Sequence, residues 1–246
     1  MPSFCIAIPT HKRAAVLVKK TLRFLAENLV PADIIHLFIQ PEEIPDYLAV
    51  LPADYPVKII HGAPGTRGQR AAIEAHFPIG TRLLCLDDDV TGVKILNHPG
   101  LPLIDMIENC FETACAAGCN LWGVYPNDNG LSMRPEIYIG ITFIIGAFYG
   151  VTLKYRLDYP SNLTEDFERS LQHYIRDGRV CRYNYIGLRT KFCGPGGLEQ
   201  YRKGTYQEDE CIAFQNRYPI HCRLRRRPGR HTDIVIRSKA QKKISV

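Results

Sequence analysis

The stretch Leu83-Leu84-Cys85-Leu86-Asp87-Asp88-Asp89-Val90 decides the fold that we expect for this chain. Four apolar residues run directly into three carboxylates, and an apolar run of that length is typical of a buried strand. The acids at its end need compensation, because an unpaired carboxylate in a low dielectric is very costly. A divalent cation would supply it, since Mg²⁺ and Mn²⁺ take oxygen ligands and complete their shell with substrate phosphates. A solvated turn is the alternative, because Asp is common in turns.

Short apolar stretches alternate with helical patterns on both sides of this strand. Strands are expected at residues 4–8, 34–39, 57–60, 83–86, 121–125, 139–151 (two strands around a glycine bend), 180–186 and 231–236. Helices are expected at residues 14–29, 71–76, 103–117, 162–177 and 205–217. This order favours an α/β fold, with a mostly parallel sheet flanked by helices.

The bulk composition favours one folded domain. The chain has 246 residues, 46% of them hydrophobic and 23% charged, which is ordinary for a globular protein. We expect no membrane-spanning helix, because no apolar run reaches about 18 residues, and no signal peptide. The nine cysteines form no Cys-x-x-Cys pair. Free thiols in a reducing cytoplasm therefore fit better than disulfides or a zinc site.

Two of the three aspartates form a natural pair for one metal ion. Successive side chains of an extended segment alternate in direction, so Asp87 and Asp89 should share a face while Asp88 points away and braces the loop. A glycine-rich loop, Gly65-Thr66-Arg67-Gly68-Gln69-Arg70, precedes this strand. Its glycines would let the backbone approach a ligand, and its arginines could pair with phosphate. A surface turn with exposed arginines is the alternative.

Two adjacent acids, Glu165 and Asp166, lie at the expected start of a helix. The helix dipole favours acids there, which is a purely structural explanation. The functional alternative makes one of them a general base, because an acceptor hydroxyl needs a carboxylate within hydrogen-bond reach as it attacks.

The net charge of +6 is concentrated at the C-terminal end. From His221 onward, nine Lys or Arg stand against Asp233 alone, so this segment carries +8 and the first 220 residues carry −2. A basic block favours a polyanion partner, and a solvated tail is the alternative.

Together these motifs resemble the GT-A nucleotide-sugar glycosyltransferases. The resemblance rests on Ile8-Pro9-Thr10-His11-Lys12-Arg13, the Gly/Arg loop, Leu86-Asp87-Asp88-Asp89, the glycine-rich apolar stretch and Thr164-Glu165-Asp166-Phe167, and covers about the first 180 residues in order. Within that superfamily, Thr164 to Leu171 and the Gly196-Gly197-Leu198 loop followed by a basic end are most similar to the TET/JBP-associated glycosyltransferases. That family includes the base J glucosyltransferase and bacteriophage enzymes acting on 5-hydroxymethylpyrimidines in DNA.

The resemblance implies a role for each matching residue. Asp87 and Asp89 would bind Mn²⁺ or Mg²⁺, with His231 or else His221 as a further ligand. Asp166 would be the base of an inverting transfer, with Glu165 as the alternative. The nucleotide sugar, expected to be a UDP-sugar, would contact Pro9, Thr10, Arg13, Gly65, Arg67, Arg70, Asp87 and Asp88. DNA phosphates would contact Arg223, Arg225, Arg226, Arg227 and Arg230.

The resemblance also implies a division of the chain. Residues 1–220 would form the GT-A domain, with a nucleotide-binding half (1–90) and an acceptor half (91–220), followed by a basic C-terminal segment (221–246). The expected setting is the cytoplasm, that of the host if a bacteriophage encodes the chain. Two other functions stay open: a GT-A enzyme with a protein, lipid-linked or polysaccharide acceptor, and a metal-dependent nuclease-like protein that uses Asp87, Asp88 and Asp89.

Overall fold

The fold was determined as a computed structural model that describes residues 2–53, 55–98, 100–190, 206–226 and 232–246. Its strands are β1 (Cys5–Pro9), β2 (Ile35–Ile39), β3 (Lys58–His61), β4 (Arg82–Leu86), β5 (Val90–Ile95), β6 (Leu121–Tyr125), β7 (Glu136–Ile141), β8 (Phe148–Thr152), β9 (Val180–Thr190), β10 (Cys222–Arg225), β11 (Asp233–Ile236) and β12 (Lys239–Ser245). Its helices are α1 (Ala14–Leu17), α2 (Arg23–Glu27), α3 (Ile44–Leu48), α4 (Gly65–His76), α5 (Leu103–Ala116), α6 (Glu165–Asp177) and α7 (Tyr206–Arg217). Three shorter turns are η1 (Val18–Leu22), η2 (Ala32–Ile34) and η3 (Pro41–Glu43).

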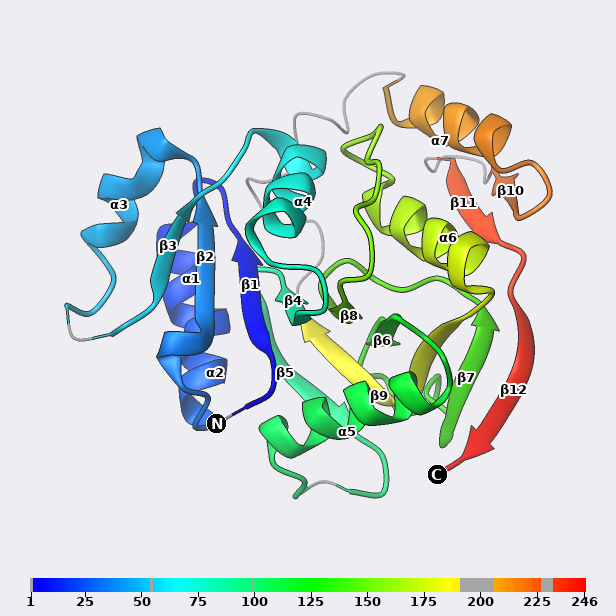
Figure 1. Ribbon diagram of the computed structural model, residues 1–246, viewed down its shortest axis with the longest axis horizontal. Coiled ribbons are helices and arrows are strands. Elements are labelled where there is room, and N and C mark those ends of the chain that lie inside the picture. Colours follow the sequence, from blue (N-terminus) through cyan, green and yellow to red (C-terminus); the bar gives the residue numbers. More distant parts are fainter. Residues whose placement is uncertain (1, 54, 99, 191–205, 227–231) are drawn as a thin grey trace.

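One large sheet runs through the molecule in the order β12-β7-β9-β6-β8-β4-β1-β2-β3, and β5 pairs with β9 (Figure 1). Its N-terminal half is parallel, because β1 pairs in parallel with both β2 and β4, and β2 with β3. Antiparallel β8 then joins β4 to β6, so the complete sheet is mixed. The expected α/β architecture, a sheet flanked by helices, is confirmed.

Alternation along the central strands divides the core into two layers. Ile6 and Ile8 pack with the side chains of α1, α2 and α5 on one face. Ala7, between them, packs on the opposite face with Ile73 and Phe77 of the α4 region. A third, smaller core joins α6 and α7 to the β10–β11 hairpin through Leu171, Phe214, Ile234 and neighbouring residues. Figure 1 shows α7 and this hairpin grouped beside α6.

Two expected loops are regular elements, so those predictions were wrong. The glycine-rich stretch from Gly65 to Arg70 forms the first half of α4. Pro64 occupies the N-cap position without a side-chain hydrogen bond, Gly65 takes a positive φ of 72°, and a Cβ on Gly68 would lie 3.2 Å from the Cβ of Ala63. The glycines thus serve a tight helix start rather than a loop. The region between the expected strand at residues 83–86 and the expected helix at 103–117, to which no element was assigned, contains β5, a short strand whose alternating side chains give a weak signal.

The last strand of the basic C-terminal segment belongs to the main sheet. β12 pairs antiparallel with β7, and the two backbones approach closely at Gly140, which has a φ of 147°. A Cβ there would lie 2.3 Å from the carbonyl oxygen of Lys239, so only glycine fits. Glycine inside a strand often marks such a close approach of two backbones.

The helix ends follow their glycines. α5 and α6 stop just before Gly118 and Gly178, both with positive φ, as expected. The eight cysteines that the structure describes are free thiols. None of the helices in the described ranges is both long enough and apolar enough to cross a membrane.

Candidate functional site

The candidate site lies where β1 and β4 end and α4 and α6 begin. The carboxyl ends of parallel strands meet at one edge of a sheet, which is where α/β proteins bind their ligands. Here β1 leads into the loop before α1, and β4 leads into Asp87, Asp88 and Asp89. The amide of Asp87 donates to the carbonyl of Ala147 (3.1 Å), which brings the start of β8 to the same edge.

Arg13 binds the second and third aspartates together. Its Nη1 lies 2.8 Å from Asp88 Oδ1, and its Nη2 lies 2.8 Å from Asp89 Oδ2. Thr10 donates to the other oxygen of Asp88 (2.8 Å), and Thr190 donates to the other oxygen of Asp89 (2.6 Å). All four carboxylate oxygens are therefore occupied, and both residues are buried. We call these two aspartates with Arg13, Thr10 and Thr190 the Arg13 cluster.

The first aspartate belongs to a different group. Nη2 of Arg70 lies 3.2 Å from Asp87 Oδ1, 3.4 Å from Glu165 Oε1 and 3.1 Å from the carbonyl oxygen of Gly146. Arg70 and Glu165 are buried, whereas 40% of the Asp87 side chain is exposed. We call Arg70, Asp87, Glu165 and Gly146 the Arg70 cluster. It joins α4, the end of β4 and the start of α6.

The predicted alternation of the three aspartates was wrong. Asp88 and Asp89 share one cation, and Asp87 is the side chain that stands apart. The reason is that the strand ends at Leu86 and the chain turns at Asp88 and Asp89, so the two-residue period of a strand no longer applies.

The π-helical turn η1 holds the turn formed by Asp87, Asp88 and Asp89 in place. The hydroxyl of Thr21, in η1, donates to the carbonyl of Asp87 (2.8 Å) and accepts from the amide of Val90 (3.0 Å). Thr21 is fully buried, and π turns inside helices occur often at functional sites. The predicted single helix over residues 14–29 is therefore interrupted where it holds this turn.

Asp166 follows Glu165 in the first turn of α6 and is partly buried. Its Oδ1 accepts a hydrogen bond from the amide of Phe167 (2.9 Å). Burial raises the pKa of Asp166, and the Glu165 carboxylate raises it further, whereas Arg169, Phe167 and Arg70 act in the opposite direction. A raised pKa suits a carboxylate that takes up a proton during a reaction.

Two residues that sequence reasoning missed lie beneath these acids. The guanidinium of Arg169 stacks on the ring of Tyr149, 3.6 Å from its centroid, and both side chains are buried. Among the described residues, Nε and Nη1 of Arg169 have no hydrogen-bond partner. Arg169 follows Glu165 by four positions, and that spacing places the two side chains on one helix face, a signal present in the sequence.

The donor set at this edge fits a hard cation through Asp87. This carboxylate is exposed, and its second oxygen has no partner among the described residues. A cation such as Mg²⁺ is usually held by one or two carboxylates plus substrate phosphates. Asp89 would have to give up Arg13 or Thr190 to become a second ligand. Within the described ranges, no three His, Cys, Asp or Glu side chains are grouped so as to hold a metal by themselves.

The other predicted nucleotide contacts surround the same edge. Pro9 ends β1, and Gly65 begins α4. Arg67 is exposed, and its amide donates to Asn162 (3.1 Å) while Nη1 donates to the carbonyl of Pro160 (3.3 Å). Arg67 and Arg70 thus both tie α4 to the segment that starts α6. Their contacts to a nucleotide stay predictions.

Of the two predicted histidine ligands, the structure describes His221, and this residue is not part of the group. His221 packs against Tyr174, with ring centroids 5.7 Å apart. Tyr174 lies nine positions after Glu165 on α6, which corresponds to roughly 14 Å along the helix. His231 lies outside the described residues, as do Arg227, Arg230 and the Gly196-Gly197-Leu198 loop.

The predicted DNA contacts that the structure describes lie on and after β10. Arg223 is exposed. Arg225 pairs with Asp233 (3.2 Å) and Arg226 pairs with Glu208 (3.0 Å), so two of the three arginines have an acidic neighbour.

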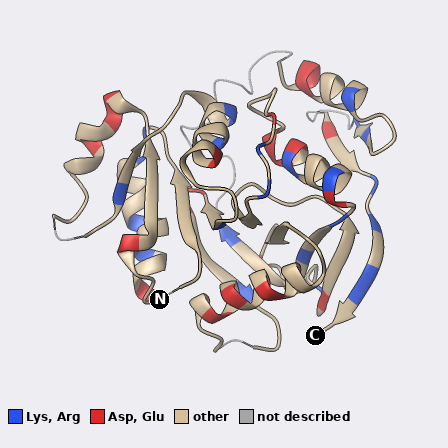
Figure 2. Ribbon diagram, viewed as in Figure 1, with Lys and Arg blue, Asp and Glu red and all other residues tan. Residues whose placement is uncertain are grey.

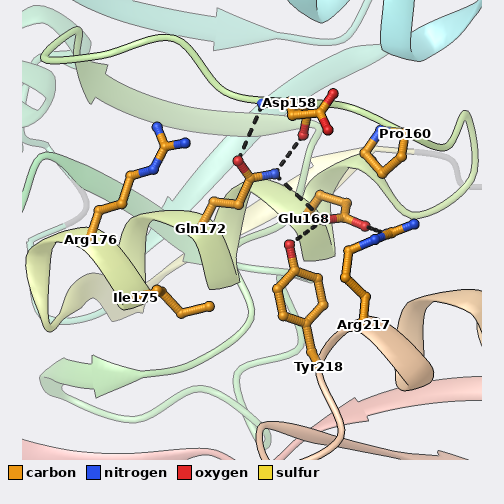
Figure 3. Close-up of a pocket in the computed structure, with 8 residues that line it drawn as sticks. All are labelled: Asp158, Pro160, Glu168, Gln172, Ile175, Arg176, Arg217 and Tyr218. Carbon is orange, nitrogen blue, oxygen red and sulfur yellow. Dashed lines mark hydrogen bonds and ion pairs between the residues drawn. The ribbon is translucent and has the colours of Figure 1, made fainter.

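Two cavities flank α6. One, of about 280 Å³, lies between the middle of α6 and the end of α7 (Figure 3). In Figure 3 the buried Glu168 carboxylate is bound by Arg217 and Gln172 and accepts a hydrogen bond from Tyr218 (2.6 Å). These contacts anchor α7 on α6. The second cavity, of about 310 Å³, lies between the start of α6, α7 and β11.

Comparisons with known proteins found distant similarities among solved structures. No protein-family model and no curated protein matches the chain. Among solved structures, it is similar to the mannosyltransferase PcManGT from Pyrobaculum calidifontis in complex with GDP-Man and Mn²⁺, with 12% identity over 74% of this chain and 56% of that one, and a TM-score of 0.48. It is also similar to TarS (1–349) from S. aureus, with 13% identity, 76% and 59% coverage, and a TM-score of 0.47. The chain thus spans less than two thirds of either structure.

Proposed function

We propose that this protein is a metal-assisted glycosyltransferase that uses a nucleotide-diphosphate sugar, with a UDP-sugar as the expected donor. The observation that carries the proposal is the Arg70 cluster. The end of β4, α4 and the start of α6 bring the exposed carboxylate of Asp87 and the buried guanidinium of Arg70 to the carboxyl edge of the parallel strands. Asp166 directly follows Glu165, which binds the same guanidinium. This arrangement can hold a diphosphate at one end and a hydroxyl at the other.

The donor end is formed by Asp87 and Arg70. Asp87 and, after exchange of a partner, Asp89 would hold Mn²⁺ or Mg²⁺, which neutralises the charge of a leaving diphosphate. Arg70 is positioned by Gly146 and Glu165, and its buried Nη1 has no partner in the described part of the chain. An arginine whose position is fixed before the ligand binds stabilises developing negative charge without reorganisation.

The acceptor end is formed by Asp166. Its carboxylate takes the proton of the acceptor hydroxyl as the hydroxyl oxygen forms a bond to the anomeric carbon of the sugar. The bond between that carbon and the diphosphate oxygen breaks, and the diphosphate leaves with the electron pair. Attack opposite the leaving group makes the transfer inverting. Glu165 is bound to Arg70, so it holds the arginine while Asp166 acts as the base.

We infer that the acceptor is the hydroxyl of a 5-hydroxymethylpyrimidine in DNA. The resemblance to the TET/JBP-associated glycosyltransferases leads to this acceptor, and the basic C-terminal segment supports it. Figure 2 shows Lys and Arg along β12, where Lys239 and Lys242 are exposed together with Arg237 before them. Such side chains bind phosphates without reading sequence.

Transfer assays with radiolabelled donors test the proposal. The protein is incubated with UDP-glucose, UDP-galactose, UDP-N-acetylglucosamine or GDP-mannose, with Mn²⁺ or EDTA, and with duplexes that carry 5-hydroxymethylcytosine or cytosine. Label should enter only the hydroxymethylated duplex, only with metal, and with one donor preferred. Label in neither duplex, together with transfer to an oligosaccharide acceptor, would support the protein or polysaccharide alternative. Metal-dependent strand cleavage without transfer would favour the nuclease-like alternative.

A further inference from the structure

Arg13 joins two carboxylates through the two ends of its guanidinium fork. Nη1 lies 2.8 Å from Asp88, and Nη2 lies 2.8 Å from Asp89. Both acids are buried, whereas 17% of the Arg13 side chain is exposed. One delocalised cation therefore compensates two negative charges that a low dielectric would otherwise make very costly.

The partners of Asp89 decide how many carboxylates this sheet edge offers to a cation. Asp87 has one oxygen without a partner among the described residues, and both oxygens of Asp89 are bound. The two acids are two positions apart, so their Cα atoms lie within about 7 Å of each other. A hard cation is usually held by one or two carboxylates plus substrate phosphates. Asp89 becomes the second carboxylate only when a partner leaves it.

Of the two side chains that bind Asp89, Arg13 is the one that can leave. Thr190 has a short side chain, and its backbone is fixed in the pairing of β9 with β5. Arg13 has a long side chain and lies in the loop between β1 and α1. Its neighbour Lys12 has a positive φ of 54°, a conformation that is unfavourable for a residue other than glycine. A rearrangement of this loop would release that strain.

Electrostatics also points to Arg13 as the partner that is exchanged. A divalent cation and a guanidinium on the same carboxylate repel each other, whereas the hydroxyl of Thr190 is neutral. Without Asp89, Nη2 of Arg13 would lose its carboxylate, and the buried Nε already has no partner among the described residues. Leaving a charged donor unpaired is costly, so Arg13 should give up Asp89 only for another anion. The diphosphate of the donor is such an anion, and phosphate pairs well with a guanidinium fork.

We propose that Arg13 couples the binding of the metal to the binding of the donor. Its guanidinium holds Asp89 until the diphosphate binds, and then exchanges Asp89 for a phosphate oxygen while it keeps Asp88. The released Asp89 joins Asp87 as a carboxylate that can hold the cation. This role rests on the proposed function, because it describes how that site takes up its metal and its donor. Two ligands that bind better together than apart share a coupling free energy, and Arg13 carries part of it.

Mn²⁺ binding with and without UDP measures this coupling. Free Mn²⁺ is followed by electron paramagnetic resonance, and the Mn²⁺ bound by UDP alone is measured separately. Arg13→Gln frees Asp89, so Mn²⁺ without UDP should bind at least about tenfold more tightly than to wild type, because a competent form populated at one tenth weakens the apparent affinity tenfold. With UDP, Mn²⁺ should bind no more tightly than to wild type, because the contact to phosphate is lost.

The matched control is Arg23→Gln, whose ion pair with Glu27 is largely exposed. Mn²⁺ binding to this variant should equal that of wild type under both conditions. A purely structural Arg13 would give the opposite pattern from the one expected, because loss of the fold weakens Mn²⁺ binding both with and without UDP. Weaker or unchanged Mn²⁺ binding to Arg13→Gln without UDP would therefore overturn the proposal.

Two further variants separate Arg13 from the other partner of Asp89. Arg13→Lys keeps a positive charge but lacks the fork that spans two carboxylates, so it disturbs the fold less. Mn²⁺ without UDP should bind to it more tightly than to wild type, by a smaller factor than in Arg13→Gln. Thr190→Val should leave this affinity unchanged. Tighter binding in Thr190→Val and none in Arg13→Lys would assign the exchange to Thr190 and overturn the proposal.

The guanidinium gives a readout in the wild-type protein. The Nε–H signal of Arg13 in a ¹⁵N–¹H spectrum is assigned from its loss in Arg13→Lys, and diamagnetic Mg²⁺ replaces Mn²⁺. The signal should stay in place with Mg²⁺ alone and should shift when UDP is added with Mg²⁺. A signal that does not respond to Mg²⁺ with UDP would contradict an exchange of partners.

The outcomes distinguish this role from the proposed function. If wild type binds neither metal in the presence of UDP and transfers no sugar, the proposed function fails and the coupling fails with it. If wild type binds Mn²⁺ with UDP and transfers sugar, while Arg13→Gln and Arg13→Lys keep the wild-type Mn²⁺ affinity, only the role of Arg13 is overturned.

Discussion

Two arginine–carboxylate clusters lie side by side at the same sheet edge, and they differ in what they leave open. In the Arg13 cluster each carboxylate oxygen of Asp88 and Asp89 has a partner, and both acids are buried. In the Arg70 cluster Asp87 is exposed, and a buried nitrogen of Arg70 has no partner among the described residues. A saturated cluster holds the turn in shape, whereas an unsaturated one has capacity for a ligand. On the proposed function, Asp87 is therefore the aspartate that is open to a ligand, whereas Asp88 and Asp89 hold the turn and Asp89 reaches a metal only by giving up a partner.

The largest expected effect comes from Asp87→Asn, which removes the negative charge of the exposed carboxylate. Transfer and donor hydrolysis should fall by about 10²- to 10³-fold, because charge stabilisation at the diphosphate is lost. The unfolding free energy should change by less than about 1 kcal/mol, because buried Arg70 keeps its contacts with Glu165 and the carbonyl of Gly146 and the Asp87 side chain is itself 40% exposed. Asp128→Asn is a matched control, since Asp128 is similarly exposed (37%) and also pairs with an arginine. Steady-state kinetics with both variants decide, and equal activities would contradict the distinction between the clusters.

Arg13→Met should lower the free energy of unfolding. It leaves Asp88 and Asp89 buried without their cation, and breaking a buried ion pair from one side costs roughly 3–5 kcal/mol. The matched control is Arg23→Met, whose ion pair with Glu27 on the same helical segment is largely exposed. Urea unfolding measures both. A loss below about 1 kcal/mol in Arg13→Met would show that the Arg13 cluster is not structural.

Thr10→Val should have a smaller effect of the same kind. The Thr10 hydroxyl donates to Asp88 and contacts the hydroxyl of Tyr47 at 2.7 Å. Since the Thr10 proton goes to the carboxylate, the tyrosine is the donor to Thr10. Loss of a hydrogen bond to a charged group costs about 2 kcal/mol. The same unfolding measurement applies, and Thr10→Ser should keep the wild-type stability.

The smallest expected effect is a shift in pH dependence at the acceptor end. Transfer should fall as pH drops through the raised pKa of Asp166, because a protonated carboxyl cannot accept the hydroxyl proton. Arg169→Gln removes a charge that opposes the shift, so the acid limb of kcat/KM should move to higher pH by about one unit. Arg176→Gln, at an exposed position on the last turn of α6, is the control.

The titration of Asp166 affects the stability of the fold in the opposite direction from its effect on activity: stability falls as the pH rises. Because the folded state holds the proton of Asp166 more tightly than the unfolded state, the contribution of this residue to stability decreases as pH rises above the ordinary Asp pKa of about 3.9.

If the acid limb of kcat/KM stays in place in Arg169→Gln, Asp166 is not the base.

The sequence determined the elements and the edge of the sheet at which the acids gather. The apolar runs of β1, β2, β4 and β6 and the glycine stops of α5 and α6 follow from local pattern, and the position of Asp87 follows from the rule that ligands lie beyond the carboxyl ends of parallel strands. The convergence of Asp87 with Glu165 does not follow from that rule, because β8, the strand before α6, runs antiparallel to β4. Arg169 was also within reach, through its four-residue spacing from Glu165.

Only the tertiary structure decided which of the three aspartates keeps a carboxylate oxygen free for a ligand. Arg13 comes from the loop between β1 and α1, Arg70 from α4 and Thr190 from the end of β9, and no spacing in the chain predicts which carboxylate each will bind. The turn after Leu86 also ends the strand alternation on which the pairing of Asp87 with Asp89 was predicted. The division of the three aspartates depends on long-range contacts, since each carboxylate takes the donor that the fold places nearest to it.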